Sequence, residues 1–459
     1  MEEMLHMGRL FGTDGVRGVA NRELTAELAL RLGRAGAYIL TRGIDHTPKI
    51  LLAKDTRRSG DMLEAALVAG LCSLGTEVYL AGVIPTPAVA YLTKKYGFDA
   101  GVMISASHNP MPDNGIKFFN NAGQKLHDAV EDEIEDIMLQ IEKEDTLPRP
   151  TGESIGTVLS LPAAERDYMD FLFSTVPDFK LPDGFTIALD CANGATAQIA
   201  PKIFAALGAK VYSLHDKPDG ININNNCGST YMDSLLAFVR EKGAHIGFAF
   251  DGDGDRMLAV DEHGNLLDGD GIMAICAQDM HRRGLLAKYT LVGTVMSNQG
   301  LEVFCREQGI RLHRADVGDR YVLEKMLQDD LTLGGEQSGH LIFRQFADTG
   351  DGILMGLQLT AALVKSGQPL SQLRKILTVY PQVLVNTTVN SKRKPEYKTH
   401  PAIIKAQSEI EGELADEGRI LVRPSGTEPL IRVMIEGKDQ MKITEQANRL
   451  ARVIAGALG

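Results

Sequence analysis

A group of polar residues follows a short apolar run whose composition is typical of a buried strand. The run ends at Ile104, and the next residues include Ser105, Ser107, His108 and Asn109. Ligands of α/β proteins bind beyond the carboxyl ends of strands, where such residues would lie. A serine held there could act as a nucleophile or carry a phosphate, whereas in a plain polar turn its hydroxyl would satisfy backbone groups. The loop by itself leaves both interpretations open.

Three carboxylates alternate with glycines directly after a second apolar run. These are Asp251, Asp253 and Asp255, and the glycines between them allow a tight backbone turn. So many anionic oxygens repel one another unless a cation joins them, and an all-oxygen set suits Mg²⁺. The pattern favours a metal site over a surface turn rich in Asp and Gly. A calcium EF-hand does not fit, because Arg256 occupies the position that requires glycine and the flanking residues are typical of strands.

Two further loops contain residues that suit a sugar phosphate. Gly335–His340 holds a carboxylate, an amide, a hydroxyl and an imidazole, which can hydrogen-bond several sugar hydroxyls. It lacks the Gly-x-Ser-x-Gly pattern of serine hydrolases, as does the loop at Ser107. Arg423–Pro429, with Arg432 just beyond, offers guanidinium groups, hydroxyls and backbone donors, which favour a phosphate over a plain turn.

Three segments of the chain repeat one strand, helix and strand pattern. Their first strands are expected at residues 50–53, 186–190 and 291–295. In each segment the helix ends at a glycine before the second strand, and a further strand then leads to one of the polar loops at Ser107, Asp251 or Glu336. Because ligands bind beyond the carboxyl ends of such strands, we expect the three loops to face one shared cleft.

The order of elements predicts an α/β protein with three related mixed α/β domains and a smaller C-terminal α+β domain around a central cleft. The C-terminal part differs because three strands and two helices are expected there without the repeated pattern. The expected domains are 1–158 with the phosphoserine loop, 159–257 with the metal loop, 258–374 with the sugar loop and 375–459 with the phosphate loop.

Charge and cysteine usage exclude several classes of function. The chain has 48 Lys and Arg against 60 Asp and Glu, so we expect no nucleic-acid or anionic-membrane partner. Its five cysteines form no Cys-x-x-Cys pair, which argues against a disulfide framework or a zinc site. An apolar run that could span a bilayer and a signal-peptide core are both lacking, so a cytoplasmic location is expected.

The motifs, in this order, resemble those of the α-D-phosphohexomutase superfamily over essentially the whole chain. The likeness rests on Gly12–Gly18, Ile104–Pro110, Asp251–Arg256, Gly335–His340 and Arg423–Pro429. The motifs are most similar to those of the bacterial members that act on glucosamine phosphates. The resemblance implies that glucosamine 6-phosphate and glucosamine 1-phosphate interconvert through a phosphoserine enzyme and glucosamine 1,6-bisphosphate. The product would feed the synthesis of UDP-N-acetylglucosamine and cell-wall precursors.

The resemblance also implies roles for individual residues. Ser107, rather than Ser105, would be phosphorylated and would hold Mg²⁺ together with Asp251, Asp253 and Asp255. Transfer would be assisted by Arg17, Lys117 and His340. Contacts to the substrate would come from His108, Asn109, Arg256, Glu336, Ser338, Arg423, Ser425, Gly426, Thr427 and Arg432.

Two alternatives to this function stay open. A phosphomannomutase or phosphoglucomutase of the same superfamily would use the same chemistry on a hexose without the amine. A non-catalytic sugar-phosphate binding protein would not need the metal-binding carboxylates, whose presence disfavours it. The resemblance implies a homodimer through the N-terminal domain, and the chain could start at Met1 or Met7, because the first motif begins soon after both.

Overall fold

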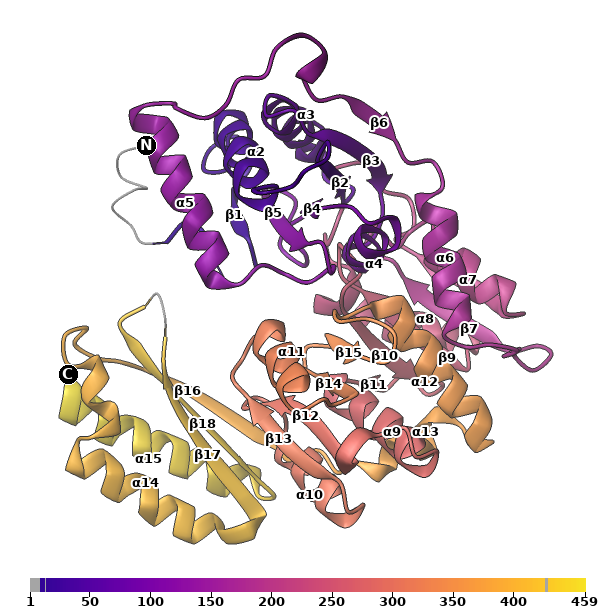
Figure 1. Ribbon diagram of the computed structural model, residues 1–459. Coiled ribbons are helices and arrows are strands. Elements are labelled where there is room, and N and C mark those ends of the chain that lie inside the picture. Colours follow the sequence, from indigo (N-terminus) through magenta and orange to yellow (C-terminus); the bar gives the residue numbers. More distant parts are fainter. Residues whose placement is uncertain (1–8, 13, 426–427) are drawn as a thin grey trace.

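The computed structural model describes residues 9–12, 14–425 and 428–459. The two possible start residues, Met1 and Met7, and the predicted phosphate ligands Gly426 and Thr427 lie outside the described residues. The described chain forms four sheets that are covered by helices (Figure 1). None of its described helices combines the length and the apolar composition needed to cross a membrane.

The first domain is built on a six-stranded sheet in the order β1-β5-β4-β2-β3-β6. Its strands are β1 (Val16–Val19), β2 (Lys49–Lys54), β3 (Glu77–Val83), β4 (Ala100–Ile104), β5 (Asp113–Asn120) and β6 (Val158–Ser160). Its helices are α2 (Ala26–Leu40), α3 (Ser59–Cys72), α4 (Thr86–Tyr96) and α5 (Asp128–Lys143). Strand β4 is buried along its whole length, as its apolar composition predicts.

The second domain contains a five-stranded sheet in the order β11-β10-β9-β7-β8. Its elements are α6 (Ala164–Ser174), β7 (Thr186–Asp190), α7 (Ala200–Ala206), β8 (Lys210–Leu214), α8 (Asp233–Lys242), β9 (Ile246–Phe250), β10 (Met257–Asp261) and β11 (Leu266–Leu267). The boundary expected at residue 257 falls at the start of β10, which pairs with β9 of this sheet. We therefore propose that the second domain continues to the end of β11.

The third domain contains a four-stranded sheet in the order β13-β12-β14-β15. Its strands are β12 (Thr290–Thr294), β13 (Arg311–Ala315), β14 (Leu333–Gly335) and β15 (Leu341–Phe343). Its helices are α9 (Gly269–Arg282), α10 (Gln299–Glu307), α11 (Asp319–Gln328), α12 (Gly352–Ser366) and α13 (Leu370–Leu373). One hydrophobic core runs through parts of all three domains, and the first domain has a second core on the other side of its sheet.

The three large sheets share one topology, which confirms the predicted repeat. In each sheet the two strands of the βαβ unit are parallel neighbours: β2 and β3, β7 and β8, β12 and β13. The next strand, β4, β9 or β14, pairs in parallel on the other side of the first. It then turns into an antiparallel partner, β5, β10 or β15. The loops at Ser107, Asp251 and Glu336 are therefore topologically equivalent.

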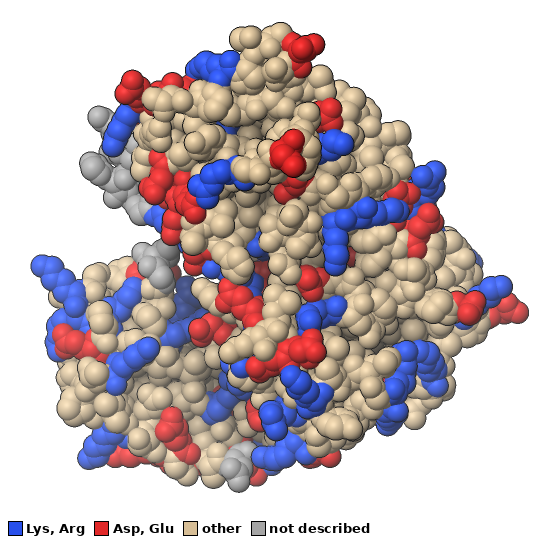
Figure 2. All heavy atoms as spheres, viewed as in Figure 1, with Lys and Arg blue, Asp and Glu red and all other residues tan. Residues whose placement is uncertain are grey.

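The C-terminal domain has a different architecture, as predicted. Its three antiparallel strands are β16 (Gln382–Thr388), β17 (Gly418–Pro424) and β18 (Leu430–Gly437), with β18 in the centre. Helices α14 (Pro401–Leu414) and α15 (Gln440–Leu458) pack on this sheet around a separate hydrophobic core. The β17–β18 hairpin points towards the first domain (Figure 1). The surface between these two domains is indented and carries charged side chains of both signs (Figure 2).

A buried carboxyl group joins two helices of the third domain. The backbone N–H of Asn298 donates to Asp270 Oδ2 at 2.6 Å, whereas the buried Asp270 Oδ1 has no hydrogen-bond partner. Burial, and then the charge of Asp268, raises the pKa of Asp270 to about 7. Because an unfolded Asp has a pKa of about 4, the folded state binds the extra proton between these values, and stability falls as the pH rises through this window.

We predict that Asp270→Asn raises the free energy of unfolding relative to the wild type. The advantage should grow from about pH 4 to about pH 7 and stay constant above, because Asn keeps the oxygen that accepts from Asn298 and does not ionise. Urea unfolding at pH 4, 6 and 8 measures this trend. Asp45→Asn, at a fully exposed side chain, is the control. A difference that does not change with pH would contradict the prediction.

Candidate active site

The serine loop, residues 105–112, leaves the carboxyl end of β4 and places Ser107 deep in the protein. Ser107 is buried and has a φ of 52°, in the left-handed region. Its Oγ donates to Asp251 Oδ2 at 2.5 Å. The hydroxyl of Ser105 instead accepts from the Ser107 amide at 2.9 Å and donates to Asp55 at 2.6 Å. Ser107 is therefore the serine whose hydroxyl faces the carboxylates.

The carboxylate loop, residues 251–256, follows β9 and brings the three predicted metal ligands together. Asp251, Asp253 and Asp255 are buried, and one oxygen of each lies within 4.8 Å of the other two. Asp253 Oδ1 and Asp255 Oδ1 are buried without a hydrogen-bond partner. Buried carboxylate oxygens without donors are costly unless a cation satisfies them. This donor set fits a hard divalent cation such as Mg²⁺.

Burial and neighbouring charges separate the proton affinities of these carboxyl groups. Burial, with the charges of Asp255 and Asp253, raises the pKa of Asp251 well above its usual range. Burial also raises the pKa of Asp255, but His340, Lys117 and Arg256 lower it by more than burial raises it. The net pKa of Asp255 therefore lies below the ordinary value. The cluster therefore has one carboxyl that resists ionisation and one that stays ionised.

Lys117 provides a buried cation beside the carboxylate loop. Its Nζ lies 2.8 Å from Asp253 Oδ2 and 3.1 Å from Asp14 Oδ2. Burial lowers the pKa of Lys117, but Asp14 and Asp253 raise it more, so the net pKa is above the ordinary value. Asp14 also pairs with Arg17. Both predicted cations of the cleft, Arg17 and Lys117, are therefore held by the same carboxylate.

His340 connects the sugar loop, residues 336–340, to the carboxylate loop. Its Nδ1 lies 3.7 Å from Asp255 Oδ2, and its Nε2 accepts from the amide of Gly350 at 3.0 Å. With Nε2 as an acceptor, the ring proton lies on Nδ1, towards Asp255. Burial lowers the pKa of His340, but the charges of Asp319 and Asp255 raise it more, and the net pKa is above the ordinary value.

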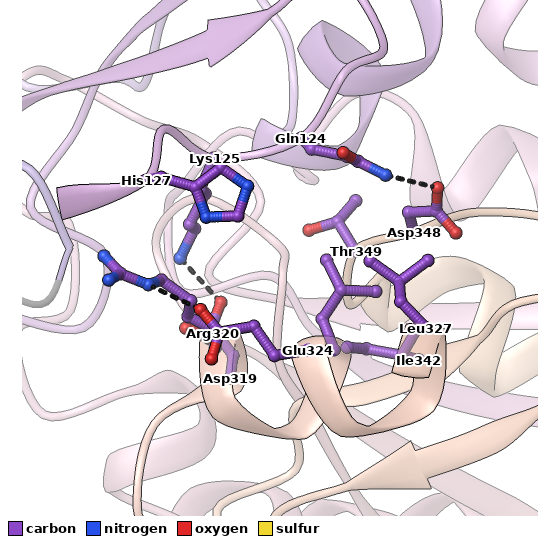
Figure 3. A pocket seen from close by; sticks show the side chains of 11 residues that line it. Gln124, Lys125, His127, Asp319, Arg320, Glu324, Leu327, Ile342, Asp348 and Thr349 are labelled. Atoms are coloured by element: carbon purple, nitrogen blue, oxygen red, sulfur yellow. Dashed lines mark hydrogen bonds and ion pairs between the residues drawn. The ribbon is translucent and has the colours of Figure 1, made fainter. Parts of the chain in front are cut away.

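Ion pairs and one hydrogen bond join the first and third domains next to this site. Lys125 Nζ lies 2.5 Å from Asp14 Oδ1 and 2.6 Å from Asp319 Oδ2. Figure 3 shows Lys125 pointing towards Asp319, and Gln124 towards Asp348, to which its side chain donates at 2.9 Å. The same half-buried acid, Asp319, lies 3.4 Å from His340 Nε2. A continuous series of charges therefore runs from the first domain to His340.

His108 contacts both the Ser107 hydroxyl and the guanidinium of Arg256. His108 Nδ1 lies 3.3 Å from Arg256 Nη1 and 3.3 Å from Ser107 Oγ. Burial, followed by the charges of Arg256 and Arg17, lowers the pKa of His108, so its ring is neutral at pH 7. The side chain of Asn109, also predicted to contact substrate, donates to Asp113 at the start of β5 at 2.9 Å.

The sugar loop presents two polar groups from the end of β14. Glu336 Oε1 accepts from the amide of Gly318 at 3.0 Å, which orients the carboxylate. The exposed Ser338 lies with its Oγ 3.4 Å from Glu336 Oε2. The carboxylate and hydroxyl can accept and donate hydrogen bonds to vicinal hydroxyls, as the sequence predicts.

The phosphate loop, residues 423–429, lies at the end of the β17–β18 hairpin. Arg423 and Arg432 are direct partners across the two strands, so two guanidinium groups lie side by side. Arg432 pairs with Glu428 at 3.5 Å, and the buried Ser425 Oγ accepts from the Glu428 amide at 3.3 Å. Among the described residues, no hydrogen bond or ion pair joins this loop to Ser107 or the carboxylate loop.

Several residues at the site were not identified from the sequence as functional. Asp14 lies within the quoted Gly12–Gly18 motif, where its carboxylate among glycines was a usable signal. Lys125 had no local signal, because its pairing with Asp319 depends on contact between two domains. Thr86 was missed for the same reason: its Oγ1 donates to Asp253 Oδ2 at 2.6 Å across the boundary between the first and second domains.

Comparison with known families agrees with this arrangement along the chain. Four models described as phosphoglucomutase/phosphomannomutase match: alpha/beta/alpha domain I at residues 8–145, domain II at 166–264, domain III at 268–380 and the C-terminal domain at 384–453. A phosphoglucosamine mutase of Acetivibrio thermocellus is 55% identical over 454 residues, which cover 99% of this chain and 100% of the relative.

Two solved structures share the fold. A phosphoglucomutase/phosphomannomutase family protein from Burkholderia thailandensis has a TM-score of 0.81 at 24% identity and covers 98% of this chain and 97% of its own. The Aspergillus fumigatus N-acetylphosphoglucosamine mutase, solved in complex with GlcNAc-6P and magnesium, has a TM-score of 0.65 at 16% identity. The match covers 98% of this chain and 96% of the Aspergillus chain. The chain therefore belongs to the phosphoglucomutase/phosphomannomutase family and, within it, to the phosphoglucosamine mutases.

Proposed function

We propose that the protein interconverts glucosamine 6-phosphate and glucosamine 1-phosphate with Ser107 as the phosphoryl carrier. Phosphoserine gives its phosphoryl to the free hydroxyl of the substrate, which forms glucosamine 1,6-bisphosphate. The bisphosphate reorients and returns its other phosphoryl to Ser107. The observation that carries the proposal is the Ser107 hydroxyl, 2.5 Å from one of three clustered and buried carboxylates.

The carboxylate loop would hold Mg²⁺ through Asp251, Asp253 and Asp255, together with an oxygen of the phosphorylated Ser107. The ion would offset the charge of the transferring phosphoryl group. The two carboxylate oxygens without donors, on Asp253 and Asp255, support this assignment. All three ligands come from one loop, so the backbone of residues 251–256 determines their spacing.

The surrounding side chains would stabilise charge during transfer. Lys117 and Arg17 supply positive charge near the phosphoryl group, where a loose transition state spreads negative charge over its oxygens. Neutral His108 lies against the serine, the guanidinium of Arg256 lies against His108, and both can donate to phosphoryl oxygens. His340, whose Nδ1 faces Asp255 and whose Nε2 accepts from Gly350, would assist transfer by keeping Asp255 ionised beside the metal site.

Substrate binding would involve two separate groups of residues. Glu336 and Ser338 would bind sugar hydroxyls, while Arg423, Ser425, Gly426, Thr427 and Arg432 would bind the phosphate that is not transferred. The paired guanidinium groups of Arg423 and Arg432 suit a dianion. Either phosphate of the bisphosphate can occupy this loop, because its donors recognise a phosphate and not the sugar, so one loop serves both orientations.

The steady-state kcat/KM for glucosamine, glucose and mannose 6-phosphates tests the proposal. The assay contains Mg²⁺ and the matching 1,6-bisphosphate as primer. Preference for the amino sugar is the expected result. Preference for a neutral hexose would keep the mechanism and change the substrate. The absence of turnover by phosphorylated protein would indicate a sugar-phosphate binding protein.

We predict that Ser107→Ala abolishes turnover and leaves the fold intact, because the variant lacks the oxygen that carries the phosphoryl group. Intact-protein mass after incubation with bisphosphate should show phosphate on the wild type and none on this variant. Ser105→Ala is the matched control, since its hydroxyl is engaged with Asp55 and it should still become phosphorylated. A Ser107→Ala enzyme with near-normal rate would exclude the serine from the mechanism.

We predict that a chelator abolishes turnover and that Asp253→Asn shifts the Mg²⁺ dependence to higher concentrations. The substitution removes one ligand charge and also weakens the contact with Lys117. Activity titrated with Mg²⁺ measures the shift, and Glu241→Gln, on the exposed face of α8, should follow the wild-type curve. Activity that does not respond to chelation would refute the metal assignment.

A further inference from the structure

Two side chains from different domains hold the backbone of the serine loop. Arg57, of the first domain, donates through Nη2 to the carbonyl oxygens of Ser107 at 3.2 Å and Asn109 at 2.5 Å. Asn224, of the second domain, donates through Nδ2 to the same two oxygens at 2.8 Å and 3.0 Å. The loop that would carry the phosphoryl group is therefore held from both sides of a domain boundary.

These contacts use both hydrogens of Arg57 Nη2, both hydrogens of Asn224 Nδ2 and the two carbonyl oxygens. The Nη2 of Arg57 and the Nδ2 of Asn224 each have two hydrogens, and each of the two carbonyl oxygens has two lone pairs. Four hydrogens therefore meet four lone pairs. If the side-chain amide of Asn224 were turned over, its acceptor Oδ1 would face both carbonyl oxygens, which are also acceptors. The contacts therefore determine the orientation of this side chain.

The loop that presents Asn224, residues 215–227, is anchored to the second sheet and to the first domain. His215 Nδ1 lies 3.0 Å from Asp190 Oδ2 at the end of β7. The backbone N–H of Asn224 donates to the carbonyl of Ala192 at 2.9 Å, and the carbonyl of Gly220 accepts from the backbone N–H of Arg58 at 2.9 Å. Asn224 therefore has a fixed position relative to the sheet from which the carboxylate loop extends.

The carboxylate loop meets this contact directly. A Cβ on Gly252 would lie 2.6 Å from the Ser107 carbonyl oxygen and 2.8 Å from Asn224 Nδ2. Only a glycine allows the metal-binding backbone, the serine carbonyl and the Asn224 amide to meet at this point. The spacing between Ser107 and Asp251 thus depends on three segments that pack against one another.

We propose that Asn224 is a positioning residue that keeps the phosphoryl-carrying serine in register with the metal-binding loop. This inference rests on the proposed function of Ser107. Arg57 ties the serine loop to its own domain, and Asn224 ties it to the domain with the carboxylates. Without Asn224, the left-handed backbone of Ser107 loses half of its carbonyl contacts, and the reacting oxygen moves relative to Asp251. Among the described residues, no hydrogen bond joins Asn224 to Glu336 or Ser338, so we expect Asn224 to act on the position of Ser107 and not on the binding of the sugar hydroxyls.

Two substitutions of Asn224 test this inference. Asn224→Asp is isosteric and places an oxygen against both carbonyls, and Asn224→Gly removes the side chain while tolerating the positive φ of 55°. We expect kcat to fall about 10- to 100-fold in both variants, with KM for glucosamine 6-phosphate within about 2-fold of wild type, because a small misplacement of reacting groups is costly. The ³¹P resonance of the phosphoserine should shift in both phosphorylated variants.

Two control variants separate the possible outcomes. Asn225→Asp makes the same charge change on the exposed neighbouring residue and should retain the wild-type kcat and ³¹P spectrum. The role of Asn224 would be overturned if both Asn224 variants kept the wild-type kcat. It would also be overturned if KM rose while kcat and the ³¹P resonance stayed unchanged. If Ser107→Ala were active in the same assay, the proposed function itself would fail, which distinguishes the two cases.

Discussion

The hydroxyl of Ser107 donates to Asp251 between loops that belong to two different sheets, and this contact constrains much of the surrounding structure. Both loops leave the carboxyl ends of equivalent strands, β4 and β9, so the repeated topology brings them to comparable positions in their domains. Two strongly polar segments can approach this closely because glycine at position 252 leaves space and because donors saturate the carbonyls of the serine loop.

Burial of many charges in a small volume is the second constraint. Carboxylates such as Asp14 and Asp319 are paired with Lys117, Lys125 or His340, and the pair of Lys125 with Asp319 links the first and third domains. Such charges are costly in isolation, but each pairing offsets part of the desolvation. Asp253 and Asp255 each retain a carboxylate oxygen without a hydrogen-bond donor, so the protein's own side chains do not offset all of the negative charge at this point. The remaining demand is for positive charge.

The C-terminal domain contributes to the site in a different way. It has its own hydrophobic core, whereas one core runs through parts of the other three domains. Its two neighbouring arginines, Arg423 and Arg432, repel each other and favour an anion between them. In the proposed reaction, a phosphate loop on a separately packed domain would release one phosphate of the bisphosphate and bind the other after the sugar turns over. This division of tasks suits a reaction in which both ends of the substrate must reach one serine.

The sequence by itself determined the repeated α/β architecture, the carboxylate loop and the order of the four motifs, because apolar runs and loop chemistry are local properties. It also pointed to Ser107 through family resemblance. Only the tertiary structure decided how the motifs combine. The roles of Lys125, Asp319 and Asn224 depend on partners more than a hundred residues away in the chain, at contacts between domains. Local composition carries no record of such contacts, because they form only when separately folded sheets pack together.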